Sequence, residues 1–200
     1  MRQETAGVTE SLLESAKREF LKYGFHNANL RRISADSGVS TNSIYTRFGD
    51  KSGLFSAVVK PAADGLMELY LDSISGASEC GNAKSATNIG GEGTEQVLEF
   101  IYDNYDAFRL IFCNSVGTEY EHYFDKLAEI EEQFYREFAK QYAGNGRRVS
   151  DFFIHVVCRS GWQYIYEVVS HEIPYDEARE FMRSIREFNY AGWNRVLEIF

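Results

Sequence analysis

The chain has 200 residues, 44% of them apolar, which is enough to bury the core of a globular protein and excludes a disordered chain. Its net charge of −9 argues at first against a nucleic-acid partner. No apolar run approaches the roughly 18 residues that cross a bilayer, the N-terminus is too polar for a secretory signal, and the three cysteines are widely spaced, so we expect a cytoplasmic protein with reduced thiols.

The charge is divided unevenly along the chain. Residues 1–60 carry nine Lys and Arg against six Asp and Glu, a net charge of +3, whereas residues 61–200 carry twelve against twenty-four, a net charge of −12. A small basic segment attached to a large acidic body is expected when only the basic segment meets a polyanion. Chance segregation of solvated charges is the alternative.

Two helices are predicted first. Apolar residues at helical spacing indicate a long helix that begins at the capping candidates Thr9 and Ser11 and ends at Gly24. Asn29 has the side chain to cap a short second helix, and Gly38 breaks the chain after it. The N-terminal segment is therefore expected to be helical.

Two further helices follow a short turn. Ser40 can cap a third helix that ends near Phe48, and Asp50 can cap a fourth over 51–60, which leads into Pro61. A helix, a tight turn and a second helix at this spacing form a helix-turn-helix pattern. The residues expected to lock the two central helices together are Ile33, Val39, Ile44 and Phe48.

The rest of the chain is predicted to be helical around one interruption. Residues 73–94 are rich in Gly, Ser, Ala and Asn, which predicts a long loop or mobile insert of undetermined role. Helical segments are expected near 95–113, 118–143, 150–172 and 175–199. The prediction is an all-α fold, with an N-terminal three-helix helix-turn-helix domain over 1–50 and a larger helical domain over 51–200.

The third predicted helix begins with the short polar side chains of Thr41, Asn42 and Ser43. On the first turn of a recognition helix such side chains let the backbone approach the bases; Asn can pair with adenine, and Thr or Ser with either base type. Groups suited to DNA phosphates lie nearby, at Asn29, Tyr45, Arg47 and Lys51. The pattern favours DNA binding, the alternative being an ordinary capped turn with Tyr45 in a core.

Residues 12–55 resemble the N-terminal domain of the TetR/AcrR family of transcriptional regulators. The matching segments read LLESAKREFLKYGF, LRRISADSGVS and SIYTRFGDKSGLF. The resemblance implies base reading and phosphate contacts by the residues just named for those roles. Ala28-Asn29 stands where the family usually has two threonines, so one phosphate-contacting hydroxyl is missing there.

In that family the C-terminal domain binds a small effector in a cavity between helices, and its last two helices pair with a second subunit. The resemblance therefore implies a homodimeric, sequence-specific DNA-binding regulator, most simply a repressor released from an inverted-repeat operator by an unidentified small molecule. The alternative is a DNA-binding adaptor whose C-terminal domain recruits a protein partner and takes no effector.

The histidines are scattered and fit no catalytic or metal-binding motif, so we expect no enzyme, no cofactor and no metal site. Aromatic residues are frequent in the acidic body, and the predicted pocket candidates are Phe108, Phe112, His155 and Tyr164, with core filling as the alternative for each. Asp106 or Glu167 would favour a cationic ligand unless each is simply a solvated carboxylate.

Dimerisation is predicted from the last two helical segments, which carry apolar residues on more than one face. The last segment has two apolar stripes, one with Phe181, Ile185 and Phe188, and the other with Tyr190, Trp193, Val196 and Phe200. The predicted interface residues are Phe153, Val157, Trp162, Trp193 and Val196. The alternative is a terminal helix that wraps its own domain.

Overall fold

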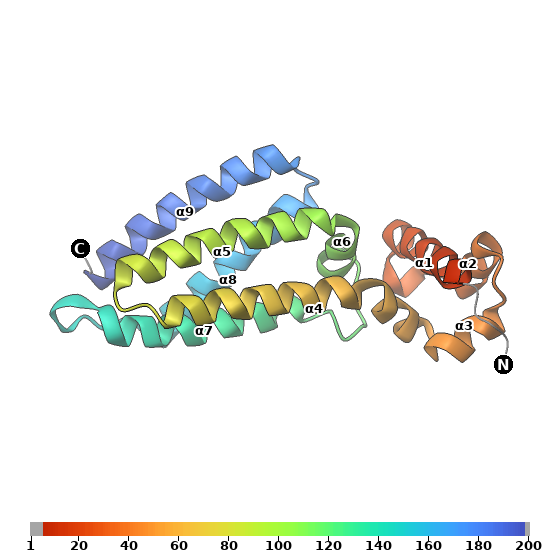
Figure 1. The fold of residues 1–200 in the computed structure, drawn as a ribbon, viewed down its shortest axis with the longest axis horizontal. Coiled ribbons are helices and arrows are strands. Elements are labelled where there is room, and N and C mark those ends of the chain that lie inside the picture. Colours follow the sequence, from red (N-terminus) through yellow and green to blue (C-terminus); the bar gives the residue numbers. More distant parts are fainter. Residues whose placement is uncertain (1–5, 199–200) are drawn as a thin grey trace. The chain divides into compact units, whose positions relative to one another are not determined.

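The computed structural model describes residues 6–198, and all regular elements within that range are helical, as predicted. In chain order (Figure 1) they are α1 (Ala6–Asn27), α2 (Leu30–Ser37), α3 (Thr41–Phe48), α4 (Lys51–Ser78), α5 (Ala83–Asp103), α6 (Tyr105–Cys113), α7 (Tyr123–Tyr142), the short 3-10 helix η1 (Gly144–Gly146), α8 (Asp151–Ser170) and α9 (Tyr175–Leu197). No helix in this range is long and apolar enough to cross a membrane.

The helices form two compact units. The first is built from residues up to 65 together with 104–123, and the second from 66–103 together with the chain after 123. Helix α4 contributes to both units, and α6 belongs to the first. The predicted division into domains over 1–50 and 51–200 stays a prediction.

Side-chain caps start three of the first four helices, as the sequence predicts. Asn29 accepts a backbone hydrogen bond at the start of α2 (2.8 Å), Ser40 at the start of α3 (3.1 Å) and Asp50 at the start of α4 (2.8 Å). Gly38, which ends α2, has a φ of 70°, a left-handed conformation that favours glycine. These local signals fix both ends of the helix-turn-helix.

The predicted inward residues of this motif are confirmed. Ile33, Val39 and Ile44 are buried, and Phe48 is half-buried. The predicted start of the first helix is wrong, because α1 already includes residues before Thr9. Neither Thr9 nor Ser11 is therefore an N-cap, and the Thr9 hydroxyl accepts a hydrogen bond from Arg47.

The expectation of a long loop over residues 73–94 is also wrong. Helix α4 continues through Pro61 into this segment, and only residues 79–82 separate it from α5. The small side chains allow the two helices to approach closely, because a methyl group at Gly93 would lie 1.9 Å from the Ser73 hydroxyl oxygen. The small residues that suggested a linker therefore allow close packing between α4 and α5.

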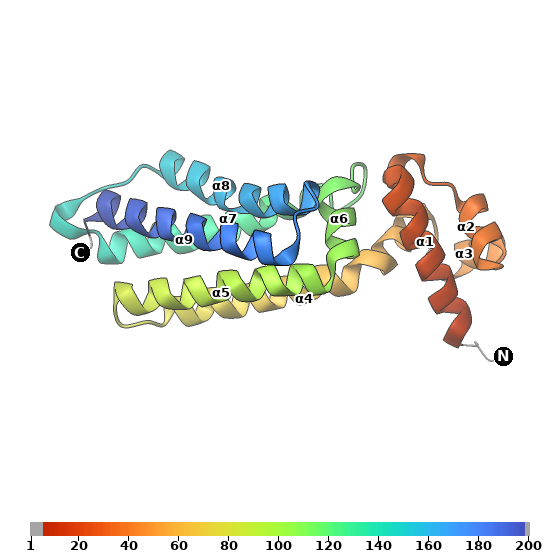
Figure 2. The same cartoon turned by 90° about the horizontal axis from the view of Figure 1, so that it is seen from above.

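In the second unit the C-terminal part of α4 and helices α5, α7, α8 and α9 run side by side as a bundle (Figures 1 and 2). Its interior is rich in aromatic contacts: the rings of Tyr70 and Trp162 meet edge to face at 5.1 Å, and those of Tyr135 and Trp193 stack at 4.5 Å. The helix predicted over 95–113 is divided in two, with α5 ending before Asn104 and α6 beginning after it.

Candidate functional site

The start of α3 presents polar side chains to solvent. Asn42 is exposed and 54% of Tyr45 is accessible, whereas Thr41 and Ser43 are half-buried. The hydroxyl of Ser43 also lies 3.0 Å from that of Ser40, the N-cap. Of the three predicted base readers, Asn42 is therefore the most accessible, and Ser43 has a second role in the cap.

Lys51, predicted to contact phosphate, also stabilises the fold. Its ammonium donates to the backbone carbonyls of His26 (3.0 Å) and Ala28 (3.2 Å) and lies 4.7 Å from the centre of the Phe25 ring. The start of α4 is thereby tied to the end of α1. An ammonium has three donors, so one remains for an anion after these two contacts.

A buried acid organises the same region and was not predicted. Glu19 of α1 is 8% exposed and accepts hydrogen bonds from the Asn29 backbone (2.8 Å) and the Arg32 guanidinium (2.8 Å). Asn29 is thus fixed by two hydrogen bonds, one from its backbone N–H to Glu19 and one that its side chain accepts from the backbone of Arg31. The signal available in the sequence was an acid among the inward positions of the first helix, beside Phe20.

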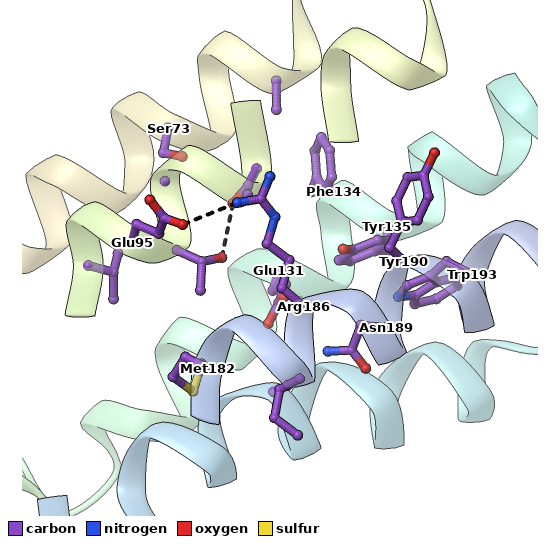
Figure 3. A pocket seen from close by; sticks show the side chains of 18 of the residues that line it. Ser73, Glu95, Glu131, Phe134, Tyr135, Met182, Arg186, Asn189, Tyr190 and Trp193 are labelled. Carbon is purple, nitrogen blue, oxygen red and sulfur yellow. Dashed lines mark hydrogen bonds and ion pairs between the residues drawn. The ribbon is translucent and has the colours of Figure 1, made fainter. Parts of the chain in front are cut away.

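The second unit contains a cavity of about 560 Å³ between α4, α5, α7, α8 and α9 (Figure 3). Phe134, Tyr135, Tyr190 and Trp193 gather on one side of it, and Ser73 and Glu95 lie on the other. Arg186 of α9 reaches across to Glu95 of α5 at 3.3 Å. The volume and the aromatic wall are typical of a site for a small organic molecule.

Two neighbouring acids of α7 have different surroundings. Glu132 is buried, but His155 (2.8 Å) and Arg136 (2.9 Å) pair with it. Glu131 lines the cavity and has no basic partner among the described residues. Burial away from water, and then the negative charge of Glu132, raise the pKa of Glu131 to about 8, although the indole of Trp162 opposes this.

The structure does not bring the four predicted pocket residues together. Tyr164 lines the cavity. Phe108 and Phe112 lie on α6 in the first unit, with ring centres 5.6 Å apart, and His155 is engaged by Glu132. Glu131 could have been suspected, since it precedes Tyr135 and Phe138 on one face of α7, at spacings of four and seven residues.

Neither acid suggested for a cationic ligand lines this cavity. Asp106 is 3.6 Å from Lys17 in the first unit, and Glu167 accepts a hydrogen bond from Gln163 at 2.6 Å. About half of each carboxylate side chain is exposed to solvent, which fits the alternative of solvated carboxylates.

The predicted interface residues occupy different environments. Phe153 is 37% exposed, Val157 and Val196 are half-buried, and Trp193 is covered by Tyr135. Trp162 is buried inside its own unit, and Phe200 lies outside the described residues. The large apolar side chains that α8 and α9 leave exposed are Phe152, Phe153, Val156, Phe181, Phe188 and Tyr190.

Comparison with known proteins agrees with this geometry. Residues 12–58 match the family model described as bacterial regulatory proteins, tetR family. The chain is 35% identical over 64 residues to the HTH-type transcriptional repressor AcnR of Corynebacterium glutamicum. That match covers 32% of this chain and 34% of the repressor, so it spans only about a third of the relative.

Solved structures resemble the whole fold. The TetR family regulator PfmR from Thermus thermophilus has a TM-score of 0.63 and 18% identity, covering 88% of this chain and 94% of that one. FadR from Bacillus subtilis, solved in complex with stearoyl-CoA, has a TM-score of 0.60 and 12% identity, covering 90% of this chain and 96% of that one. At identities this low, the similarity shows a shared fold and nothing about a shared function.

The capped helices α2 and α3, joined by a glycine turn, define a helix-turn-helix protein of all-α architecture. Taken with the family match over residues 12–58, they identify this segment as a DNA-binding domain of the tetR family type, and the solved structures show that the chain shares the fold of TetR family regulators.

Proposed function

We propose that the chain is a homodimeric repressor that binds an inverted-repeat operator in the cytoplasm and is released from it by a small-molecule effector. The observation that carries this proposal is the exposed polar start of α3, with Asn42 and Tyr45 open to solvent inside the segment that matches the family. Asn42 would read base edges in the major groove, while Tyr45 and Lys51 contact phosphates.

The dimer follows from the geometry of DNA. Two copies of a recognition helix read two half-sites about one helical turn apart, so one chain alone reads half of the operator. Exposed apolar side chains of α8 and α9 that do not line the cavity, such as Phe152, Phe153 and Phe188, support a two-fold interface formed by these helices. Phe152, 75% exposed, and Phe188, 69% exposed, are the most accessible of them.

The effector would act from the cavity in the second unit. A ligand shifts the protein between DNA-competent and released conformations only by the difference in its affinity for the two. The stearoyl-CoA bound by FadR supports this part of the proposal, because a protein of the same fold holds a small molecule. An adaptor that takes no effector would show no thermal stabilisation by small molecules.

Replacing Tyr45 by phenylalanine is expected to weaken binding about fivefold, to specific and random duplexes alike, because a phosphate contact carries no sequence information. Tyr166→Phe, the same chemical change in α8 of the second unit, is the control and should leave affinity unchanged. Fluorescence anisotropy on both duplexes measures the effect. A loss confined to the specific duplex would contradict the assignment of Tyr45 to phosphate.

Selection of bound sequences from a random duplex library, at near-physiological salt, tests the proposal. The wild type should enrich an inverted repeat, and the Thr41→Ala, Asn42→Ala double variant should not. The same selection is then repeated with candidate effectors. A compound that releases the protein from its operator should abolish enrichment of the inverted repeat. Equal, unenriched recovery by both proteins would remove α3 as the base-reading element.

A further inference from the structure

Glu131 lines the cavity without a positively charged partner in the described part of the chain. The groups that face Glu131 from the surrounding helices are Tyr70, Glu132, Tyr135, Cys158 and Trp162. Burial raises the pKa of both tyrosines and of Cys158 above the usual range, so these three stay uncharged near neutral pH. Of the nearby arginines, Arg136 pairs with Glu132 and Arg186 with Glu95, and Arg183, which also lines the cavity, is exposed to solvent.

The walls around this acid suit a cation. The rings of Tyr70, Tyr135 and Trp162 line the same cavity, and an aromatic face attracts a positive charge. Gly161 of α8 leaves room beside the carboxylate, since a methyl group there would lie 3.7 Å from Oε2 of Glu131. No hydrogen bond of ordinary geometry reaches the buried hydroxyl of Tyr70 from the residues that the structure describes, which leaves it available to a polar group of a ligand.

We propose that the effector of this cavity is a lipophilic organic cation, whose positive centre pairs with Glu131 and whose apolar body lies against the aromatic wall of α7 and α9. This inference rests on the proposed effector role of the cavity and specifies the chemical class. The positive charge of the ligand balances the negative charge of Glu131, which no basic side chain among the described residues balances. Above about pH 8, where Glu131 is ionised, an organic anion would instead bring a second negative charge to this site and be rejected.

Tetraphenylphosphonium and tetraphenylborate test the charge preference, because they have nearly the same shape and opposite permanent charges. Each is titrated calorimetrically into the full chain without DNA, at about pH 8.5, where most of Glu131 is ionised. The cation should bind at least about tenfold more tightly than the anion. Glu131→Gln should lose about tenfold in affinity for the cation. Glu137→Gln, which removes an exposed acid of α7 outside the cavity lining, is the matched control and should bind as the wild type does.

A pH series separates pairing with Glu131 from a general effect of the mutation. Because the charge of the probe is fixed, its affinity for the wild type should rise with pH until Glu131 is fully ionised, whereas Glu131→Gln should show no such rise. Equal binding of the two probes, or an unchanged affinity in Glu131→Gln, would overturn the inference.

Operator binding is measured separately, so that the two proposals fail in different ways. If the cation binds through Glu131 but leaves operator affinity unchanged, the cation site stands and the effector role falls. If tetraphenylborate, and not the cation, releases the operator, the effector role stands and the cation assignment is overturned.

Discussion

Replacing Gly53 by alanine is expected to destabilise the first unit by about 2–4 kcal/mol and to abolish measurable operator binding. A methyl group on this residue would lie 1.9 Å from the backbone carbonyl oxygen of Phe48. A backbone atom cannot turn aside as a side chain can, so the turn between α3 and α4 must move. That movement displaces α3 together with Lys51.

Thermal and urea unfolding measure the change in stability, and anisotropy measures the change in affinity. The control is Gly7→Ala in α1, where a methyl group meets nothing within 4 Å. This change should be neutral or stabilise by up to about 1 kcal/mol, since alanine favours a helix. Wild-type stability and operator affinity in Gly53→Ala would contradict the tight α3–α4 turn.

Replacing Glu131 by glutamine is expected to stabilise the unliganded protein at alkaline pH and to have little effect at acidic pH. The pKa of this carboxyl rises from an ordinary 4.5 to about 8 in the folded state. The fold therefore retains a proton that the unfolded chain loses between these values, and its stability falls as pH rises through that window. The advantage of the glutamine variant should grow to the order of 3 kcal/mol near pH 8.5.

Urea unfolding of both proteins at about pH 5 and pH 8.5 measures this difference. Glu137→Gln, an exposed position on α7, controls for removal of a negative charge from that helix and should show a much smaller pH dependence. A constant difference between Glu131→Gln and the wild type at both pH values would show that Glu131 ionises in the folded state as it does in the unfolded chain.

The DNA-binding segment could be predicted because its signals are local. A cap needs only one side chain and the next few backbone amides, so Asn29, Ser40 and Asp50 could be identified without knowledge of the tertiary structure. The same holds for Gly38, whose left-handed φ ends α2. The contact of Lys51 with the end of α1 joins residues far apart in the sequence, so no local sequence pattern could predict it.

The second unit was harder to predict because packing between distant helices decides its structure. Residues 73–94 have the composition of a loop, but Gly93 is buried close to Ser73 where α5 packs against α4. Phe108 and Phe112 resemble pocket residues in sequence, yet α6 joins the first unit. The many aromatic residues indicated that a cavity could have an aromatic lining. Only the arrangement of five helices showed that Glu131 lines this cavity.

The ratio of operator to random-duplex affinity, compared between the wild type and Asn42→Ala, tests the central claim most directly. At one fixed salt concentration, the variant should lose about tenfold or more on the selected operator and almost nothing on random duplex, because a base contact is removed while the phosphate contacts remain. An equal loss on both duplexes, or no loss on either, would contradict base reading by the exposed start of α3.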